Sequence, residues 1–543
     1  MTTCSKKSIA LLIALVLVLA MTACAPPEEA VDDPDDPVDD PVEEVTYKTE
    51  LVAAMGEEIQ STDHQQVTTI FGLVNGLIST PPMSMGLGNN QILPHGAQSV
   101  EVSEDGLEIR FTFDPSRTYH NGVPATAESY KQAVDRYLDI GPYAYDWDPV
   151  EEMIVDGDTL IMKLDRAGPG MFVLTSSSYG APVEVGAADE MGEDAFGRAA
   201  VGCGPYIVDE WVDGSHITMV RNDDHKNYLP FVENNEAFHF EKVTVRFIPE
   251  SLTRISELRA GSVDLILGVP GEQLATLEQD PDIEVHGYLG ANVRYIEMNT
   301  QIFPLDDINV RLAIALALDR DELAAGVNDV IVPNFSMAGP AMIRHSPETE
   351  QRLSETYGTD VDRARELLLE AGWEPGSDGI MVKDGERLSI EFAINADRAV
   401  NTRAAPIMQA QLERAGIDVA LREFTRPYIR EIVQAGDFDM ALCDWSWLDP
   451  GGIWPYSHHS QGSMSQFGDP EIDALMDAAC EEPDETVGAQ RWGEVSEAMW
   501  EKLPIFPVWS DRHFLATRAE LTGLQVGVSG ALYLHDVKVE IRE

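Results

Sequence analysis

Basic residues and cysteines are scarce in this sequence. Its 543 residues hold 37 Lys and Arg against 94 Asp and Glu, and the formal net charge is −57. A chain this acidic does not bind nucleic acid or an anionic membrane surface through its charge. None of its 5 cysteines lies in a CxxC pair, so neither a zinc site nor a thioredoxin-like redox site is indicated.

Signatures of catalysis are missing as well. The sequence contains no HExxH, GxSxG or GxxxxGK[ST] pattern. His458 and His459 are adjacent, but neighbouring side chains of a strand point in opposite directions, which does not favour a shared metal ion. Acidic residues are so numerous that chance pairs of carboxylates single out no glycosidase dyad. We therefore expect no enzymatic activity, no cofactor and no metal site.

The apolar run near the N-terminus is too short to cross a membrane as a helix. It covers residues 9–21, whereas a spanning helix needs roughly 20 residues. Lys6 and Lys7 precede the run and Ala23 follows it, which is the order of a secretory signal. The next residue is Cys24, and the whole stretch resembles a bacterial lipoprotein signal. This resemblance implies a signal peptide over residues 1–23 and a lipid on Cys24; an ordinary signal peptide with an incidental cysteine is the alternative.

The chain that follows is acidic and rich in proline. Residues 25–44 contain neither an aromatic nor a basic residue, so they bury too little apolar surface to fold. Proline and charge repulsion keep such a segment extended, and residues 24–46 are predicted to be a tether of roughly 50 Å or more. About 500 residues remain, enough for two or three subdomains. Their cysteines, Cys203, Cys443 and Cys480, allow at most one disulfide, whose pairing stays open.

The rest of the chain alternates strand patterns with helix patterns, which predicts a mixed α/β protein. Alternating apolar residues indicate strands over 107–113 and 217–221. Thr126 is the expected N-cap of one helix. Asp306 and Asp307 are expected to cap a long helix that ends near Gly326. Glycine and proline positions predict further helices over 361–371 and 402–415 and from Pro470 onward, with a strand over 417–422.

Five segments of the body, taken in order, resemble the family 5 extracellular solute-binding proteins, the group of bacterial oligopeptide, dipeptide and nickel receptors. One begins FDPSRTYHNG, another reads GCGPYIVDEW at its start, and a third runs YIEMNTQIFPLDDINVRLAIALALDRDEL. Together the five cover residues 113–139, 202–228, 258–264, 295–323 and 364–373.

The resemblance implies a two-lobed periplasmic-binding-protein fold of type II, a Venus flytrap with an extra subdomain in the first lobe. We expect lobe 1 over residues 47–295, with the subdomain at about 76–190, and lobe 2 over residues 296–505. Residues 506–543 would return to complete lobe 1. The chain would cross between the lobes near residues 290–299 and 503–508, and these two crossings would form a hinge.

The resemblance also implies a function. The protein would be the substrate-binding component of an ABC importer that captures a small solute, with a short peptide as the leading expectation, and delivers it to the permease subunits. A nickel chelate, a sugar, an opine or another amine is the alternative ligand, and a secreted hydrolase is the alternative class. We expect a monomer held by its lipid on the outer side of the cell membrane, facing the periplasm or the exterior.

Candidate ligand contacts follow from the same resemblance. Arg398 lies about where dipeptide receptors hold the ligand carboxylate, and Arg403 is the neighbouring alternative. Residues 439–456, DMALCDWSWLDPGGIWPY, resemble a family loop whose aspartate grips the ligand amine. The loop is shorter here, and Asp449 is the acid that matches, with helix capping or turn stabilisation as the alternative role. The loop also carries three tryptophans that would either stack on a ligand or pack in the core: Trp445, Trp447 and Trp454.

Overall fold

The computed structural model describes residues 45–87, 91–328, 330–460, 467–527 and 530–541. The predicted signal peptide, most of the predicted tether and Cys24 lie outside these residues. Among the helices in the described ranges, none is long and apolar enough to cross a membrane.

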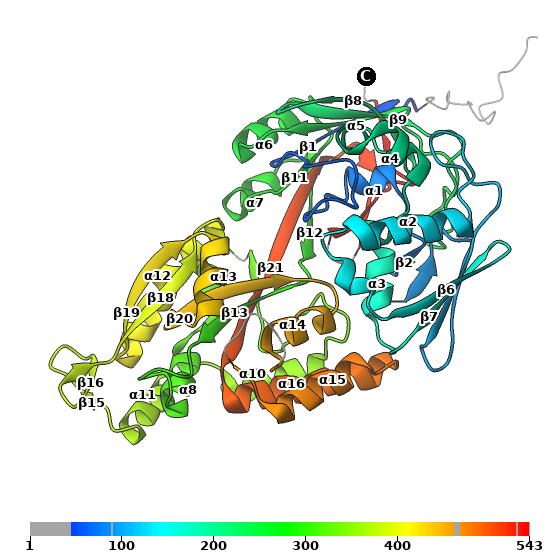
Figure 1. Cartoon of the computed structure of the whole chain (residues 1–543). Coiled ribbons are helices and arrows are strands. Elements are labelled where there is room, and N and C mark those ends of the chain that lie inside the picture. The colour runs from blue at the N-terminus through cyan, green and yellow to red at the C-terminus, as the bar shows by residue number, and fades with distance from the viewer. Residues whose placement is uncertain (1–44, 88–90, 329, 461–466, 528–529, 542–543) are drawn as a thin grey trace, which may run out of the picture. The chain divides into compact units, whose positions relative to one another are not determined.

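One long strand pairs with strands of both lobes and joins them (Figure 1). Strand β21 (Ile505–Arg518) pairs with β13 (Asn292–Met298) through residues 505–509. Through residues 512–518 the same strand pairs with β12 (Ile283–Leu289). The partner of β21 therefore changes between residues 509 and 512. The other crossing is the short connection from β12 to β13.

Lobe 1 is a mixed sheet with an apolar core on each of its two faces. Strand β1 pairs in parallel with β10 and β11, and β8 and β9 extend the sheet at its edge. Helices α6 and α7 pack beside β11, β12 and β21. The bounds are β1 (Glu50–Met55), β8 (Tyr206–Val212), β9 (His216–Arg221), β10 (Lys242–Phe247), β11 (Leu265–Leu267), α6 (Ser251–Arg259) and α7 (Gly271–Leu277).

An antiparallel sheet of four strands and its helices form the subdomain. The strand order is β4-β5-β7-β6, and a core of its own includes Phe111, Tyr130 and Trp147. The predicted cap is confirmed, since the Thr126 side chain accepts the amide N–H of Ser129 and the Ser129 hydroxyl accepts that of Thr126. The bounds are β4 (Ser99–Val102), β5 (Glu108–Thr112), β6 (Val150–Asp156), β7 (Thr159–Leu164), α2 (Ala127–Ile140) and α3 (Gly170–Ser176).

Lobe 2 is a sheet with apolar cores on both of its faces. Its order is β19-β18-β20-β13-β21, and all seven residues of β13 are buried. One core lies under helices α8 (Ile308–Ala317), α11 and α12, and another lies under α14, α15 and α16. The bounds are β18 (Ser389–Asn395), β19 (Asp418–Phe424), β20 (Met440–Ser446), α10 (Pro347–Tyr357), α11 (Val361–Glu370), α12 (Ala399–Ala415), α13 (Arg426–Ala435), α14 (Trp454–His458), α15 (Pro470–Cys480) and α16 (Glu485–Lys502).

The prediction of one long helix after Asp307 is wrong, because the structure has two helices there. Helix α8 (Ile308–Ala317) ends before Leu318, whose backbone is extended, and α9 (Arg320–Gly326) follows. Asp319 starts the second helix by accepting the amide N–H of Glu322, while its own N–H donates to the Gln411 side chain. The other expected helices are present as α11, α12 and α15, although α12 begins three residues earlier, at Ala399.

The three cysteines of the folded chain are free thiols. Cys203 is buried, whereas Cys443 and Cys480 are partly buried. No disulfide therefore links Cys203, Cys443 and Cys480 in the described part of the chain.

Candidate functional site

Strand β20 and the loop after it lie where lobe 2 meets the subdomain. Trp445 is near the end of β20, and Trp447 follows one residue beyond the strand. Tyr179 of the subdomain packs against Trp447 with the ring centroids 6.4 Å apart. Tyr145 of the subdomain stacks almost parallel on Tyr456, at 6.4 Å and an angle of 5°. Aromatic rings from the two sides thus face one another across this junction.

A cavity of about 190 Å³ lies within this junction. The subdomain contributes Tyr145, Asp146 and the segment around Gly168, and lobe 2 contributes Trp447 and Asp449. Backbone groups meet closely here. A Cβ atom built on Gly168 would lie 2.3 Å from the carbonyl oxygen of Cys480. The cavity therefore exists only when the subdomain and lobe 2 are together.

This cavity holds two carboxylates, Asp449, which is buried, and Asp146, which is partly buried. Burial raises the pKa of Asp146 to about 6, and the negative charge of Asp148 adds to the rise. Burial also raises the pKa of Asp449 to about 6, although Arg344 and the amide of Gly451 act in the opposite direction. Within the described residues no basic side chain forms an ion pair with Asp146. Both groups would gain from a cation placed in the cavity.

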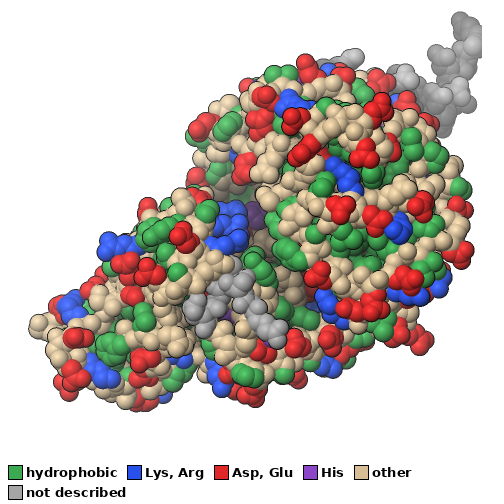
Figure 2. Space-filling view, viewed as in Figure 1, with side chains coloured by type: hydrophobic (Ala, Val, Ile, Leu, Met, Phe, Trp, Pro, Cys, Tyr) green, Lys and Arg blue, Asp and Glu red, His purple; other side chains and the backbone are tan. Residues whose placement is uncertain are grey.

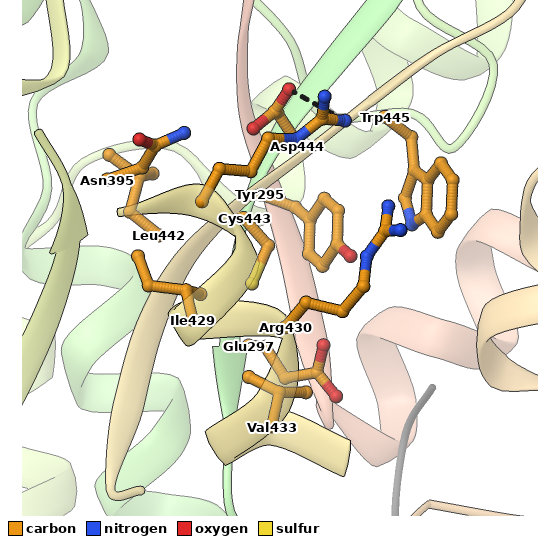
Figure 3. Close-up of a pocket in the computed structure, with 11 residues that line it drawn as sticks. Tyr295, Glu297, Asn395, Ile429, Arg430, Val433, Leu442, Cys443, Asp444 and Trp445 are labelled. Carbon is orange, nitrogen blue, oxygen red and sulfur yellow. Dashed lines mark ion pairs between the residues drawn. The ribbon is translucent and has the colours of Figure 1, made fainter. Parts of the chain in front are cut away.

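A second, smaller cavity opens between α13 and the strands β13 and β20 (Figure 3). Its volume is about 40 Å³, room for about three water molecules. Helix α13 lines it with Arg426, Ile429, Arg430 and Val433. The guanidinium carbon of Arg430 lies 5.3 Å from the ring centre of Trp445, close enough for a cation–π contact. The remaining lining residues are Tyr295, Glu297, Asn395, Leu442, Cys443 and Asp444.

A patch of basic side chains lies on this side of lobe 2. Figure 2 shows this patch beside the hollow between the lobes, near the ends of α12 and α13, whereas the rest of that face carries many acidic side chains with scattered basic ones. Arg426 and Arg430 also act on the subdomain, because they oppose the rise that burial causes in the pKa of Tyr143. An anionic group entering here would meet positive charge against an acidic background.

A buried ion cluster fixes β20 to the crossing strands. Arg294 on β13 is fully buried and pairs with Asp444 at 2.9 Å and with Asp511 at 2.6 Å. Asp511 lies on β21 where that strand changes partner, and Asp444 precedes Trp445. Arg294 holds the pKa of Asp511 below its usual range although burial acts in the other direction. The end of β20 that carries Asp444 is thus joined by ion pairs to both crossing strands.

The deciding comparison is with models of known families. Residues 91–464 match the model of the bacterial extracellular solute-binding proteins, family 5, in its middle region. That match covers well over half of the chain. The chain belongs to this family.

Curated relatives and solved structures agree with the family assignment. This family 5 protein is 25% identical over 443 residues to the probable D,D-dipeptide-binding periplasmic protein DdpA of Escherichia coli K12, a match covering 79% of this chain and 81% of the relative. The structure of HbpA2 from Haemophilus parasuis superposes with a TM-score of 0.76 at 19% identity, over 91% of this chain and 100% of that chain. DppA from Helicobacter pylori, solved with the peptide STSA, gives 0.70 at 21% identity, over 91% and 99%.

The predicted family and fold are therefore confirmed. The family 5 protein has the two-lobed fold of type II periplasmic binding proteins with an extra subdomain, and it is the substrate-binding component of an ABC importer. It is a protein of the periplasmic or extracellular side. The expected boundaries of the lobes and the expected ligand contacts remain predictions.

The structure brings together only some of the residues expected to contact the ligand. Trp447 and Asp449 line the larger cavity and Trp445 lines the smaller one. Asp449 also accepts the amide N–H of Gly451, as the alternative role of turn stabilisation requires. Trp454 is fully buried in a lobe 2 core, and its indole N–H donates to the carbonyl of Met337.

Arg398 and Arg403 lie at the start of α12, away from both cavities. The Arg398 side chain is exposed, and its charge helps burial to lower the pKa of His513 on β21. Arg403 pairs with Glu272 of α7 at 3.1 Å, an ion pair between the two lobes. Arg398 thus lies within electrostatic range of His513 on β21, whereas Arg403 is engaged in a contact between the lobes.

Several residues of the site were not expected from the sequence. They share no local pattern, since they come from separate elements that meet only in the folded chain: Tyr145, Asp146, Tyr179, Glu297, Arg426, Arg430 and Tyr456. One signal was available in advance, because Glu297 is an acid within the strand sequence YIEM, where an apolar residue would be expected.

Proposed function

We propose that this binding protein captures short peptides at the junction of the subdomain and lobe 2. We further propose that it hands them to the permease from a lipid anchor on Cys24, as a monomer. The observation that supports the ligand class is the pair of desolvated carboxylates, Asp146 and Asp449, that share one cavity. A peptide ammonium is a compact cation that would pair with them when the cavity closes.

The opposite end of a peptide carries a carboxylate, and lobe 2 offers guanidinium groups for it. A planar guanidinium fits a carboxylate with two parallel hydrogen bonds. Arg398 and Arg430 are the candidates, because no described acidic side chain forms an ion pair with either. Arg426 is less available, since it already lies 3.4 Å from Asp444.

Aromatic rings would cover the peptide between its ends. Tyr145, Tyr456 and Trp447 are partly exposed at the junction, so they offer apolar surface that a ligand would bury. Such rings accept varied side chains because stacking needs shape more than specific polar partners. A peptide held by its two charged ends and loosely by its middle is the expected mode of binding.

Isothermal titration calorimetry of the purified protein tests this function. The panel contains dipeptides and tripeptides, their N-acetylated and C-amidated forms, free amino acids, sugars, opines and nickel with histidine. The proposal is supported if free peptides bind and if N-acetylation and C-amidation each weaken that binding by at least about tenfold. Each modification would leave one buried charge of the protein without its partner. Binding of another class, with no affinity for peptides, would overturn the peptide proposal.

A further inference from the structure

Glu297 is a carboxylate in a strand that is otherwise a core strand. All seven residues of β13 are buried, and the Glu297 side chain is 5% exposed. A carboxylate in such a place is costly unless a cation or several hydrogen bonds compensate it. Its neighbours in the smaller cavity, Tyr295 and Cys443, are acids whose pKa values burial raises, so neither brings a positive charge.

The compensation within the described chain is weak. His458 is the one basic side chain paired with Glu297, and Nε2 lies 3.5 Å from the carboxylate, beyond an ordinary hydrogen bond. The ring is fully buried, its Nδ1 interacts with the Ser457 hydroxyl at 2.7 Å, and Nε2 has no hydrogen-bond partner among the described residues. Both groups therefore retain capacity for a polar ligand atom.

The walls between Glu297 and the mouth of the cavity are apolar. Ile429 and Val433 on α13 are buried and pack against the face of β20 that carries Ala441 and Cys443. Figure 3 shows the Glu297 carboxylate beside Val433, and the Arg430 guanidinium higher up beside Trp445. Arg430 and Val433 are about one helical turn apart, roughly 5 Å along α13, which is close to the length of a lysine side chain.

The order of these groups matches one chemical class. The cavity has a volume of about 40 Å³, with a guanidinium at its mouth and a carboxylate at its bottom. The walls between the two groups are apolar and suit the methylene groups of a side chain. We propose that this cavity is a subsite for a basic amino-acid residue with a free carboxylate, such as a C-terminal lysine or ornithine. The carboxylate would bind Arg430 and the side-chain ammonium would bind Glu297. The inference rests on the proposed function, because it assumes a peptide or amino-acid ligand.

Paired ligands test the subsite in the unaltered protein. Ala-Lys and Ala-norleucine differ in the terminal ammonium, and free lysine and norleucine differ in the same way. Calorimetry is expected to give at least about tenfold tighter binding of the lysine member, since the buried acid is left unpaired by norleucine. Equal affinities, or no binding of any of the four, would overturn the inference. If only the free amino acids bind, the peptide function fails while the lysine-to-norleucine ratio still decides the subsite.

A variant assigns the preference to Glu297. Glu297→Gln is expected to abolish the lysine preference and to leave the affinity for Ala-norleucine within about twofold. Glu391→Gln is the control, because Glu391 lies in an exposed ion pair with Arg422 on the far edge of the same sheet. A lysine preference that survives Glu297→Gln would place the selective group elsewhere. If Glu297→Gln has a clearly lower melting temperature than the unaltered protein, the comparison of lysine and norleucine ligands in the unaltered protein alone decides whether the subsite exists.

Discussion

Arg294 shows how strongly a single side chain can depend on its neighbours. It is fully buried between Asp444 and Asp511, so its removal leaves two carboxylates in the interior. Arg294→Met is expected to lower the free energy of unfolding by about 3–5 kcal/mol, the usual effect of breaking a buried pair from one side. Denaturant unfolding followed by circular dichroism measures the change.

The matched control for that experiment is Arg422→Met. Arg422 pairs with Glu391, and both side chains are about half exposed, so the expected loss is below about 1 kcal/mol. Equal losses in the two variants would contradict the importance of the buried cluster.

Ligand binding is expected to depend on pH through Asp146 and Asp449. Both have a pKa of about 6 in the folded protein, so both lose their charge as the pH falls below that value. Affinity for a ligand with an ammonium group should therefore fall between pH 7 and pH 5, as measured by calorimetry. Asp146→Asn should flatten this profile. A profile that is already flat in the unaltered protein would argue against these acids as ammonium partners.

The same raised pKa values affect stability in the opposite direction. Each folded-state pKa lies above the value of an unfolded aspartate, so the folded protein binds protons more readily. The contribution of these two groups to stability increases as the pH falls from above 6 towards 4. Between pH 7 and pH 5, these two groups should therefore increase the stability of the ligand-free protein while its affinity for the ligand falls.

Arg398 tests the role expected from the sequence. Its side chain is exposed, and its charge acts on His513 of β21. Arg398→Ala is expected to weaken an anionic ligand by about 2 kcal/mol if the closed form buries the pair. Arg422→Ala, on the edge strand β19, is the control. Unchanged affinity in calorimetry would leave Arg430 as the carboxylate partner.

At the level of elements, the segment around Gly168 limits how closely the subdomain approaches lobe 2. An added Cβ atom would meet the Cys480 carbonyl at 2.3 Å, and the backbone has φ +141. Gly168→Ala is expected to weaken ligand binding by at least about tenfold, because the cavity needs both sides in contact. The control is Gly157→Ala, also at positive φ, where nothing lies within 4 Å. Equal affinities for the two variants would show that this contact does not control the cavity.

Local patterns predicted the elements whose ends depend on neighbouring residues. The cap at Thr126 and the left-handed Gly416 at the end of α12 are such cases. The break between α8 and α9 is held partly by a contact that periodicity does not reveal, because the Asp319 N–H donates to Gln411, 92 residues away. Glu297 and Asp146 were missed as site residues for the same reason. Their surroundings come from elements far apart in the sequence, and periodicity carries no information on that packing.

At the scale of the whole molecule, the expected attachment to the membrane depends on one residue, Cys24. If Cys24 carries the lipid, Cys24→Ala should move the protein from the membrane fraction to the soluble fraction, without changing ligand affinity. Cys4→Ala is the control, since Cys4 lies within the predicted signal peptide. An unchanged distribution for Cys24→Ala would favour an ordinary signal peptide.

Strand β21 has a consequence for the order of events during synthesis. Its residues 505–509 complete the sheet of lobe 2, and residues 512–518 join the sheet of lobe 1. Neither sheet has all its strands until almost the whole chain has left the ribosome. The protein is therefore expected to acquire its native structure late and in a single event rather than lobe by lobe, so nascent chains ending before Ile505 should stay sensitive to protease.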